Sequence, residues 1–305
     1  MHTLNLSGAF VLIPSYVRSK TFRELLSNHT VVLPGAINAL SALLIEQMGF
    51  EAMYLSGAVL ANSVGGYPDT GMMTLTESEK HSQSIANASS LPIVADADTG
   101  YGENENTART VQVLEHAGVS AIHLEDQVFP KRCGHLEGKQ LVPVEEFAEK
   151  IAAAVAARTS DDFLVIARTD ARSVEGYDDA VRRAQLYLEV GAEAIFPEAL
   201  TGEDELRRFA QDVDTLLLAN MTEFGKTPYY SADEFADMGY NMVIFPVTLQ
   251  RAAMKAMERV LTVIKDTGSQ ASCVEDMQTR QELYDLLGYD GCVPSGKMGQ
   301  IGLNC

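Results

Sequence analysis

One pattern occurs three times in this chain and strongly limits how the chain can fold. The segments AGVSAIHLED (117–126), VGAEAIFPEA (190–199) and MGYNMVIFPV (238–247) each lead from a helix-like stretch, through a glycine, into a short apolar run. Glycine readily ends a helix in the left-handed conformation. A continuous apolar run is typical of a parallel strand that is buried on both faces. The pattern therefore predicts helix–strand units arranged around a parallel sheet.

Apolar runs of this kind lie between helical patterns along most of the chain, and we count eight of them. They are Val31–Pro34, Ala52–Leu55, Pro92–Ala95, Ala121–Leu124, Phe163–Ala167, Ala194–Phe196, Thr215–Ala219 and Met242–Phe245. Eight strands separated by helices predict a (β/α)₈ TIM-type barrel. A doubly wound sheet is the alternative, since a sequence does not reveal strand order. The barrel is favoured because no glycine-rich dinucleotide motif follows the first strand.

The domain organisation follows from the same pattern. Helices are predicted between the strands, at Lys20–Asn28, Asn38–Met48, Asn106–His116, Glu145–Arg158, Asp178–Glu189, Asp204–Asp212 and Ala232–Met238. No linker divides the chain, so we predict one barrel domain over 1–305. Its C-terminal part, 248–287, is expected to form two long helices, Thr248–Lys265 and Ser272–Leu287. The glycine-rich tail at 288–305 is expected to be flexible.

Composition limits the partners and the compartment. The net charge of −19 argues against nucleic acid or an anionic membrane as a partner. No apolar run approaches the roughly 18 residues of a membrane helix. The N-terminal segment lacks basic residues before its short apolar patch, so no signal peptide is expected. The four cysteines show no CxxC spacing and are expected to be reduced thiols in a cytoplasmic protein.

Carboxylates cluster at the ends of two neighbouring predicted strands. Asp96 and Asp98 follow the third strand, and alternation along an extended chain points them to the same side. Glu125 follows the fourth strand. Three such carboxylates offer hard oxygen ligands for a Mg²⁺ ion that keeps several waters. A simple turn is the alternative for the two aspartates, because Asp followed by Gly often reverses a chain.

Further polar groups follow the later strands. They are Arg168, Glu198, Asn220, Thr222, Glu223 and Arg251. Each alone could be an ordinary surface residue. Side chains at the same end of consecutive barrel strands nevertheless converge on one mouth. Arg168 and Arg251 would there suit the carboxylates of a substrate.

The loop after the fourth strand carries the sequence KRCGH (131–135). The Cys133 thiol is flanked by two cations and an imidazole, which can tune its proton affinity. A cysteine is more often a small buried hydrophobic residue, but the polar loop argues against that here. His135 could instead serve only as a local cap. His123, inside the fourth strand, could be a structural histidine.

KRCGH resembles the signature of the isocitrate lyase and phosphoenolpyruvate mutase superfamily. The resemblance extends from YLSGA (54–58) to DMQTRQELYD (276–285). Within the superfamily, ARTDA (167–171), FPEA (196–199), NMTEFGKTP (220–228) and the segment around Arg251 are most similar to the 2-methylisocitrate lyases.

This resemblance implies a (β/α)₈ lyase that cleaves 2-methylisocitrate, a tricarboxylate, to pyruvate and succinate. It implies Mg²⁺, with Mn²⁺ as the alternative ion, held by Asp96 and Asp98 with Asp69 and Glu125 nearby. Cys133 would be the general acid and Tyr54 the base. A homotetramer that exchanges a C-terminal helix near Ser272–Leu287 is also implied. The substrate would contact Ser56, Gly57, Ala58, Cys133, Gly134, Arg168, Glu198, Asn220, Met221, Thr222, Arg251 and Arg280.

Two departures and several alternatives remain. Ala58 stands where closer relatives often have a second glycine, which would narrow the pocket by a methyl group. The tail after Tyr289 does not resemble the family. Another lyase or hydrolase of the superfamily, acting on 2,3-dimethylmalate or oxaloacetate, is the main alternative. A phosphonomutase is less favoured, since the cysteine loop would have little to do there. A non-catalytic ligand-binding barrel is the alternative from another class.

The chemistry of the cleavage bears on the role of Cys133. Breaking the bond leaves an electron-rich carbon beside a carboxylate, which needs a proton rather than a nucleophile. Lys131, Arg132 and His135 would lower the thiol pKa, whereas the dianion forming beside it would raise it. We expect the second effect to dominate when the loop closes over the substrate.

Overall fold

The computed structural model describes residues 13–289, and its centre is one parallel sheet. The strands are β1 (Val31–Pro34), β2 (Met53–Leu55), β3 (Ile93–Asp96), β4 (Ala121–Glu125), β5 (Leu164–Thr169), β6 (Ala194–Pro197), β7 (Leu216–Asn220) and β8 (Met242–Phe245). They follow the order β1-β8-β7-β6-β5-β4-β3-β2. A bridge between Gly35 and Tyr54 joins β1 to β2 and completes the circuit. The predicted barrel is confirmed, and the doubly wound alternative is wrong.

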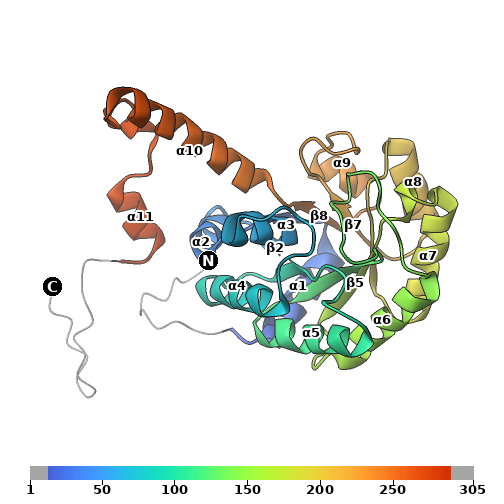
Figure 1. Cartoon of the computed structure of the whole chain (residues 1–305). Coiled ribbons are helices and arrows are strands. Elements are labelled where there is room, and N and C mark those ends of the chain that lie inside the picture. Colours follow the sequence, from blue (N-terminus) through green and yellow to red (C-terminus); the bar gives the residue numbers. More distant parts are fainter. Residues whose placement is uncertain (1–12, 290–305) are drawn as a thin grey trace, which may run out of the picture. The chain divides into compact units, whose positions relative to one another are not determined.

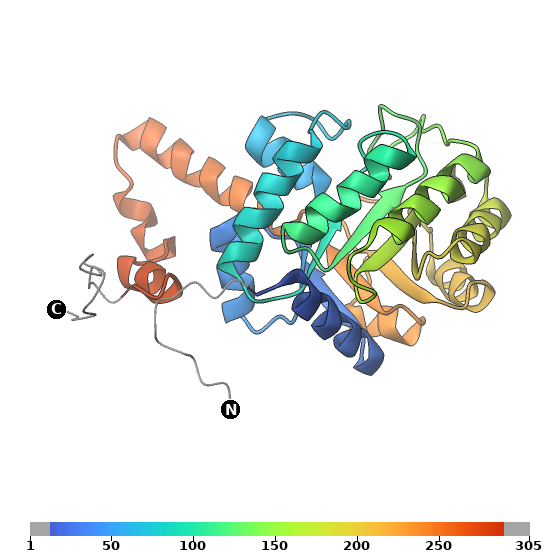
Figure 2. The same ribbon diagram turned by 90° about the horizontal axis from the view of Figure 1, so that it is seen from below.

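Helices surround the strands on the outside of the barrel (Figures 1 and 2). They are α2 (Ala39–Gln47), α3 (Gly57–Leu60), α4 (Leu75–Ala88), α5 (Asn104–His116), α6 (Val144–Ala157), α7 (Tyr177–Glu189), α8 (Glu203–Asp212) and α9 (Ala232–Asp237). The first helix, α1 (Ser15–Asn28), precedes the strands, and its Phe22 and Leu26 belong to the apolar cluster inside the barrel. Parallel strands need such crossovers, so the helices follow from the strand pattern. The carboxyl ends of all the strands consequently lie at one mouth.

Apolar side chains fill two separate layers. Leu33, Ile166 and Phe196 belong to the cluster inside the barrel. Ile122 and Val165 belong to the larger cluster between strands and helices. Neighbouring residues of one strand enter opposite layers because successive side chains point to opposite faces. The barrel interior is therefore a packed core, and chemistry is left to its mouth.

Most predicted elements agree with the structure to within two residues, but α4 was not predicted. Thr74 caps this helix, and its hydroxyl accepts from Glu77 N, while the Glu77 carboxylate accepts from Thr74 N. This reciprocal capping box corresponds to the sequence TLTE, a recognisable signal for a helix start. The short helix α3 was also missed. It begins at Gly57, which only Ser56 separates from the end of β2.

The chain divides into two compact units, one ending at Ala252 and the other beginning at Ala253. Helix α10 (Thr248–Thr267) begins in the barrel unit and continues into the second. There, the single helix predicted over Ser272–Leu287 is wrong. The structure has a 3₁₀ helix, Ala271–Asp276, and then α11 (Arg280–Leu286). Thr279 caps α11 through a capping box with Glu282. A new helix therefore starts here, within the range predicted as one helix.

The predicted flexible tail falls largely on residues 290–305, outside the described residues. Across 13–289, no helix has both the length and the apolar character required to span a bilayer.

Candidate active site

The two aspartates predicted as metal ligands lie together beside β2. Asp96 Oδ2 accepts from Gly57 N at 3.1 Å, and Asp96 Oδ1 accepts from Asp98 N at 3.0 Å. A Cβ atom on Gly57 would lie 2.9 Å from Asp96 Oδ2 and 3.3 Å from Asp98 Oδ1. β3 ends at Asp96, and Asp98 has a left-handed backbone with φ 46°. The bend after the strand, rather than alternation along it, therefore brings the second carboxylate to the site.

Lys131 lies between two of the acids. Its ammonium nitrogen is 2.9 Å from Asp98 Oδ1 and 2.5 Å from Asp69 Oδ1. Burial acts to lower the pKa of Lys131, but Asp98, Glu125 and the other acids raise it well above its ordinary value. Lys131 was expected only to tune Cys133. The structure shows it as the cation that pairs with the buried Asp98 and the partly exposed Asp69.

Several buried oxygens in this region suit a divalent cation. Both carboxylate oxygens of Glu125 are buried and accept no hydrogen bond from the described residues, whereas the buried Asp98 Oδ1 faces the Lys131 ammonium at 2.9 Å. Burial raises the pKa of Asp98 to about 6 and that of Glu125 well above its usual range. Residues 13–289 contain no ready-made cage of three His, Cys, Asp or Glu side chains. Carboxylate oxygens such as those of Asp98 and Glu125 are the ligands that Mg²⁺ takes in proteins, one or two at a time together with waters.

Tyr54 and His123 form a buried pair below these acids. The Tyr54 hydroxyl lies 2.7 Å from His123 Nε2, which is 3.7 Å from Asp96 Oδ1. Burial lowers the pKa of His123 to about 4 and raises that of Tyr54 well above its ordinary value. Both side chains are therefore neutral near pH 7. The role of Tyr54 as a base stays a prediction.

Arg168, on β5, is surrounded by carboxylates. Its Nε is 3.0 Å from Asp170 Oδ2 and 3.4 Å from Glu125 Oε2, and its Nη2 is 3.2 Å from Glu198 Oε2. Burial acts to lower the pKa of Arg168, but Asp170, Glu125 and Glu198 raise it well above its usual value. Burial acts to raise the pKa of Glu198, but Arg168 and His135 hold it well below its usual range. These contacts hold the Arg168 guanidinium in one position at the mouth of the barrel. We call the paired Arg168 and Glu198 side chains the fork.

The tip of the loop after β4 packs directly on this fork. A Cβ on Gly134 would lie 2.4 Å from Arg168 Nη2 and 2.5 Å from Glu198 Cγ. His135 Nε2 lies 3.2 Å from Glu198 Oε1, and His135 Nδ1 accepts from Lys226 N at 3.0 Å. Only glycine can approach the fork this closely. The predicted residues Gly134, Arg168 and Glu198 are thus brought together.

Cys133 is half-buried next to them. Burial is the largest cause that raises its pKa above the ordinary value of 9.0, and the charges of Asp69 and Glu198 act in the same direction. The flanking cations do not lower it as the sequence suggested. Lys131 is paired with two aspartates, and the Arg132 guanidinium donates to the Glu137 carbonyl. Cys133 is therefore a protonated thiol at neutral pH, which suits an acid.

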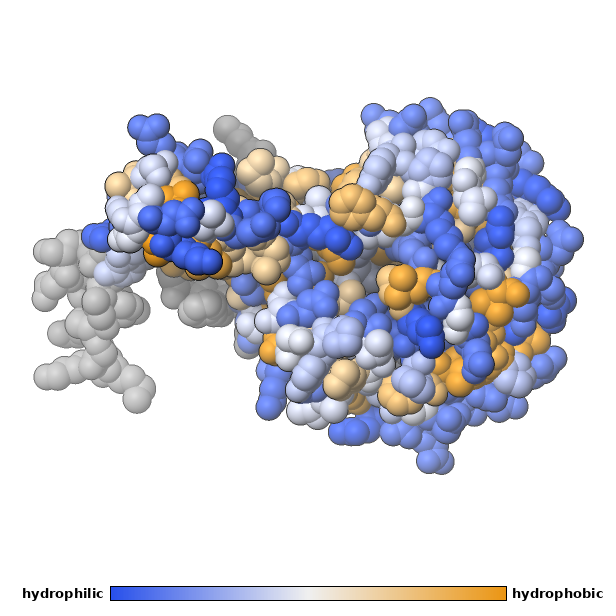
Figure 3. All heavy atoms as spheres, turned by 45° about the horizontal axis from the view of Figure 1, so that its top comes forward, coloured by the Kyte–Doolittle hydropathy of each residue, from blue (hydrophilic) through white to orange (hydrophobic). Residues whose placement is uncertain are grey.

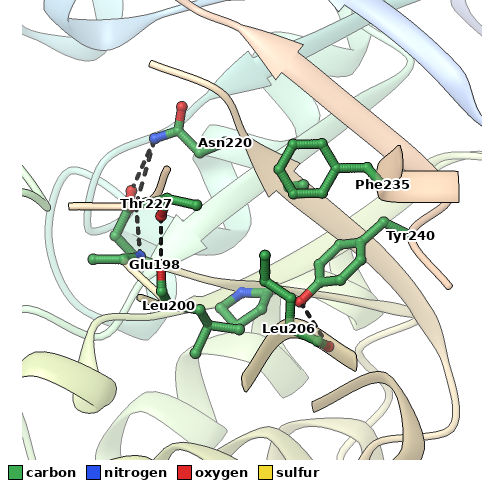
Figure 4. Close-up of a pocket in the computed structure, with 10 residues that line it drawn as sticks. Glu198, Leu200, Leu206, Asn220, Thr227, Phe235 and Tyr240 are labelled. Atoms are coloured by element: carbon green, nitrogen blue, oxygen red, sulfur yellow. Dashed lines mark hydrogen bonds between the residues drawn. The ribbon is translucent and has the colours of Figure 1, made fainter. Parts of the chain in front are cut away.

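The end of β7 completes this side of the mouth. Asn220 Nδ2 donates to Glu198 Oε2 at 3.2 Å, and the Thr227 hydroxyl donates to the Leu200 carbonyl at 2.6 Å (Figure 4). These residues line a cavity of about 10 Å³, the room of one water molecule. Met221 and Thr222 follow Asn220 and are buried.

The remaining predicted substrate residues lie on different elements. Ser56 caps α3, and Ala58 lies in its first turn after Gly57. Arg251 is half-exposed on α10, with its Nε 3.5 Å from Glu223 Oε2 and its guanidinium over the Phe224 ring. Arg280 is the first residue of α11, in the second compact unit.

A larger cavity, of about 730 Å³, opens among the loops after β2, β3 and β4, and Met73, Tyr101 and Phe129 are among its lining residues. Neither cavity is lined by Cys133, Asp96 or Arg168. The tip of the loop after β4 packs on Arg168 and Glu198 at this end of the barrel. The visible surface of the barrel unit is otherwise mostly hydrophilic, with apolar side chains in small groups (Figure 3).

Two buried residues of the site were not predicted. Lys139 Nζ lies 2.6 Å from Asp170 Oδ1 and also donates to the Gly134 carbonyl. Asp170 belongs to the recognisable segment ARTDA, which was a signal for it. Lys139 had no such signal, because its partner Asp170 lies 31 positions further along the chain.

The comparisons with known proteins agree with this geometry. A family model described as phosphoenolpyruvate phosphomutase matches residues 22–265. The 2-methylisocitrate lyase of Aeropyrum pernix is 53% identical over 268 residues, covering 88% of this chain and 86% of the relative. The 2-methylisocitrate lyase of Bacillus subtilis is 51% identical over 269 residues, covering 88% of each.

Solved structures give the same result. A crystal structure of 2,3-dimethylmalate lyase, a PEP mutase/isocitrate lyase superfamily member, has a TM-score of 0.85 and 38% identity, covering 91% of this chain and 93% of that one. Phosphonopyruvate hydrolase in complex with oxalate and Mg²⁺ has a TM-score of 0.80 and 32% identity, covering 90% and 95%. The chain therefore belongs to the PEP mutase/isocitrate lyase superfamily and is a carbon–carbon lyase.

Proposed function

We propose that this lyase cleaves 2-methylisocitrate to pyruvate and succinate. The observation that carries the proposal is the protonated Cys133 thiol, held in a loop whose tip packs on the Arg168–Glu198 pair. An acid beside a fixed cation is what a departing carbanion next to a carboxylate requires. The names of the two similar relatives support the same substrate.

A divalent ion belongs to the proposal. Asp96 and Asp98 would hold Mg²⁺, or Mn²⁺, with Asp69 and Glu125 close by. The buried oxygens of Glu125, which accept no hydrogen bond from the described residues, and the buried Asp98 carboxylate support this assignment. The bound ion supplies Lewis-acid polarisation of the substrate's 2-hydroxyl oxygen.

The chain's own residues bind the substrate and move its protons. Ser56, Gly57 and Ala58 receive the oxo-acid end, while Arg168 and Asn220 bind carboxylate oxygens of the other half. The hydroxyl proton leaves, the C–C bond breaks, and its electron pair goes to the carbon of the succinate half. Cys133 gives that carbon its proton.

Tyr54 is the proposed acceptor of the hydroxyl proton. Its hydroxyl lies 2.7 Å from His123 Nε2, and this contact holds the Tyr54 side chain in place.

The assembly is proposed from the C-terminal helices. Met254, Met257, Leu261 and Ile264 repeat along α10 at spacings of three and four residues, which places them on one helical face. We infer that this face packs on a neighbouring copy in a homotetramer with an exchanged C-terminal helix. A reduced cytoplasmic setting fits the unpaired cysteines among the described residues.

A second candidate is a 2,3-dimethylmalate lyase. It is favoured by Arg251, whose guanidinium already contacts Glu223 and Phe224. 2,3-Dimethylmalate has one carboxylate fewer than 2-methylisocitrate, so its binding needs one cation fewer. Purified protein, assayed with 2-methylisocitrate, 2,3-dimethylmalate and oxaloacetate, separates the candidates. We expect the highest kcat/KM with 2-methylisocitrate and equal amounts of pyruvate and succinate. A higher value with either other acid would contradict the proposal.

A further inference from the structure

The catalytic loop has a paired neck and a separate tip. Val128 N donates to the Gln140 carbonyl at 2.8 Å, and Val142 N donates to the Asp126 carbonyl at 3.0 Å. These backbone bonds hold the two limbs of the neck together. The tip between them, residues 131–137, carries Cys133. Cys133 lines neither of the two cavities described above, and the neighbouring Gly134 packs against Arg168 and Glu198.

Lys139 lies on the returning limb, just below the tip. It is 6% exposed, and its partner Asp170 is fully buried. Its ammonium bonds Asp170 Oδ1 at 2.6 Å and the Gly134 carbonyl oxygen. Asp170 Oδ2 in turn accepts from Arg168 Nε at 3.0 Å. Lys139 therefore joins the tip to the same charged fork on which Gly134 packs.

We propose that Lys139 is a positioning residue for Cys133, and that the Lys139–Asp170 pair is the latch that holds the loop tip closed. The Lys139 ammonium donates a hydrogen bond to the carbonyl oxygen of the Gly134–His135 peptide. Because the acceptor is a backbone oxygen, this contact does not depend on the side chains of the tip. The kinetic part of the test below rests on the proposed function, whereas the hydrogen–deuterium exchange part does not.

The contacts on the other side of the same peptide explain why its orientation matters. The N–H group of this peptide belongs to His135 and acts to lower the pKa of the Cys133 thiol, against the larger effect of burial. Fixing the carbonyl with Lys139 thus fixes the N–H that faces the sulfur. The His135 ring is bound separately by Glu198. Lys139 binds the peptide carbonyl and Glu198 binds the His135 ring. If the carbonyl is released, we expect the position of the Cys133 thiol to become variable.

A merely structural lysine offers a matched control. Lys150, on α6, is also 6% exposed, and its carboxylate partner Glu103, 3.7 Å away, is largely exposed. This ion pair involves no residue of the tip. Lys139→Met and Lys150→Met both exchange a buried ammonium for an apolar chain of similar length. In Lys139→Met, Asp170 still has Arg168 as a partner, so folding should persist.

The test combines hydrogen–deuterium exchange of the tip with steady-state kinetics on the full-length protein. In Lys139→Met, amides of 131–137 should exchange on the order of tenfold faster, while those of the neck do not change. With 2-methylisocitrate, kcat should fall about 100-fold through misplacement of Cys133, with KM nearly unchanged. Lys150→Met should match the wild type in both measurements.

Wild-type exchange at the tip, or an unchanged kcat, would overturn the latch. If Lys139→Met does not fold, Asp170→Asn serves instead, and the same two changes are expected. Loss of folding in both variants would assign the pair to stability alone and would also overturn the proposal. If the wild type does not cleave 2-methylisocitrate, the proposed function fails, while the exchange experiment still decides the latch.

Discussion

The Lys131 ammonium lies 2.9 Å from Asp98 Oδ1 and is almost entirely buried. A second acid, Asp69, contacts the same ammonium. One cation therefore offsets part of the cost of burying two carboxylates at the mouth of the barrel. Glu125 and Asp96 add negative charge nearby, and both raise the pKa of Lys131. The surplus of negative charge suits a site that binds a divalent ion.

The variant Asp98→Asn tests whether this excess of negative charge binds a divalent ion. We expect the variant to fold and its activity to fall by orders of magnitude, because a metal ligand is lost. The thermal stabilisation that Mg²⁺ gives the wild type should also shrink. Differential scanning fluorimetry with and without Mg²⁺ measures it. Asp178→Asn, at an exposed site with one long ion pair, is the control. Full activity of the wild type under strong chelation would refute the metal assignment.

Arg251→Met tests the choice of substrate. If Arg251 binds the additional carboxylate of a tricarboxylate, its loss leaves that carboxylate unpaired. The penalty in kcat/KM should be about 2 kcal/mol, or roughly thirtyfold, for 2-methylisocitrate. For 2,3-dimethylmalate it should be much smaller. Arg208→Met, which removes another surface arginine from the barrel, is the control. Equal losses with both substrates would favour the shorter acid as the natural one.

Gly134→Ala tests the close approach of the loop to the fork. The added methyl would meet Arg168 Nη2 at 2.4 Å, so the tip cannot seat as before. We expect kcat to fall about 100-fold with little change in melting temperature. Gly202→Ala adds a methyl where nothing lies within 4 Å. That variant should keep wild-type kinetics. Normal turnover by Gly134→Ala would show that the tip need not pack on Arg168.

The protonation of Cys133 can be followed by alkylation. Its pKa is raised from 9.0, chiefly by burial, so the thiol stays protonated to higher pH than an ordinary cysteine. The iodoacetamide rate, followed on the Cys133 peptide by mass spectrometry, should rise with a midpoint above pH 9 in the free enzyme. The denatured chain provides the reference. A midpoint below pH 7 would mean that the thiolate predominates at neutral pH, which would contradict the role of acid.

The strands could be predicted from sequence because they are buried on both faces, so each is a short apolar run. β1 and β8 have the predicted bounds. The prediction of one helix over Ser272–Leu287 missed the break between Asp276 and Arg280. Thr279 caps a new helix there, and this local signal overrides the apolar periodicity of the longer segment. A strand end also tells which residues reach the mouth, and Asp96, Arg168 and Glu198 were found in this way.

Contacts across the mouth could not be predicted in the same way. Asp98 reaches the site through a left-handed bend, which alternation does not describe. Lys131 pairs with an aspartate 62 positions away, and Lys139 with one 31 positions away. Such pairs depend on loop conformation, and this is fixed by the whole network of buried charges.

The turnover of Cys133→Ser is the most direct test of the account's central claim, that Cys133 donates the proton which completes C–C cleavage. Serine is similar in size but a far weaker acid. We predict that 2-methylisocitrate still binds, by calorimetry, while kcat falls by orders of magnitude. Near-normal kcat in the serine variant would contradict the claim.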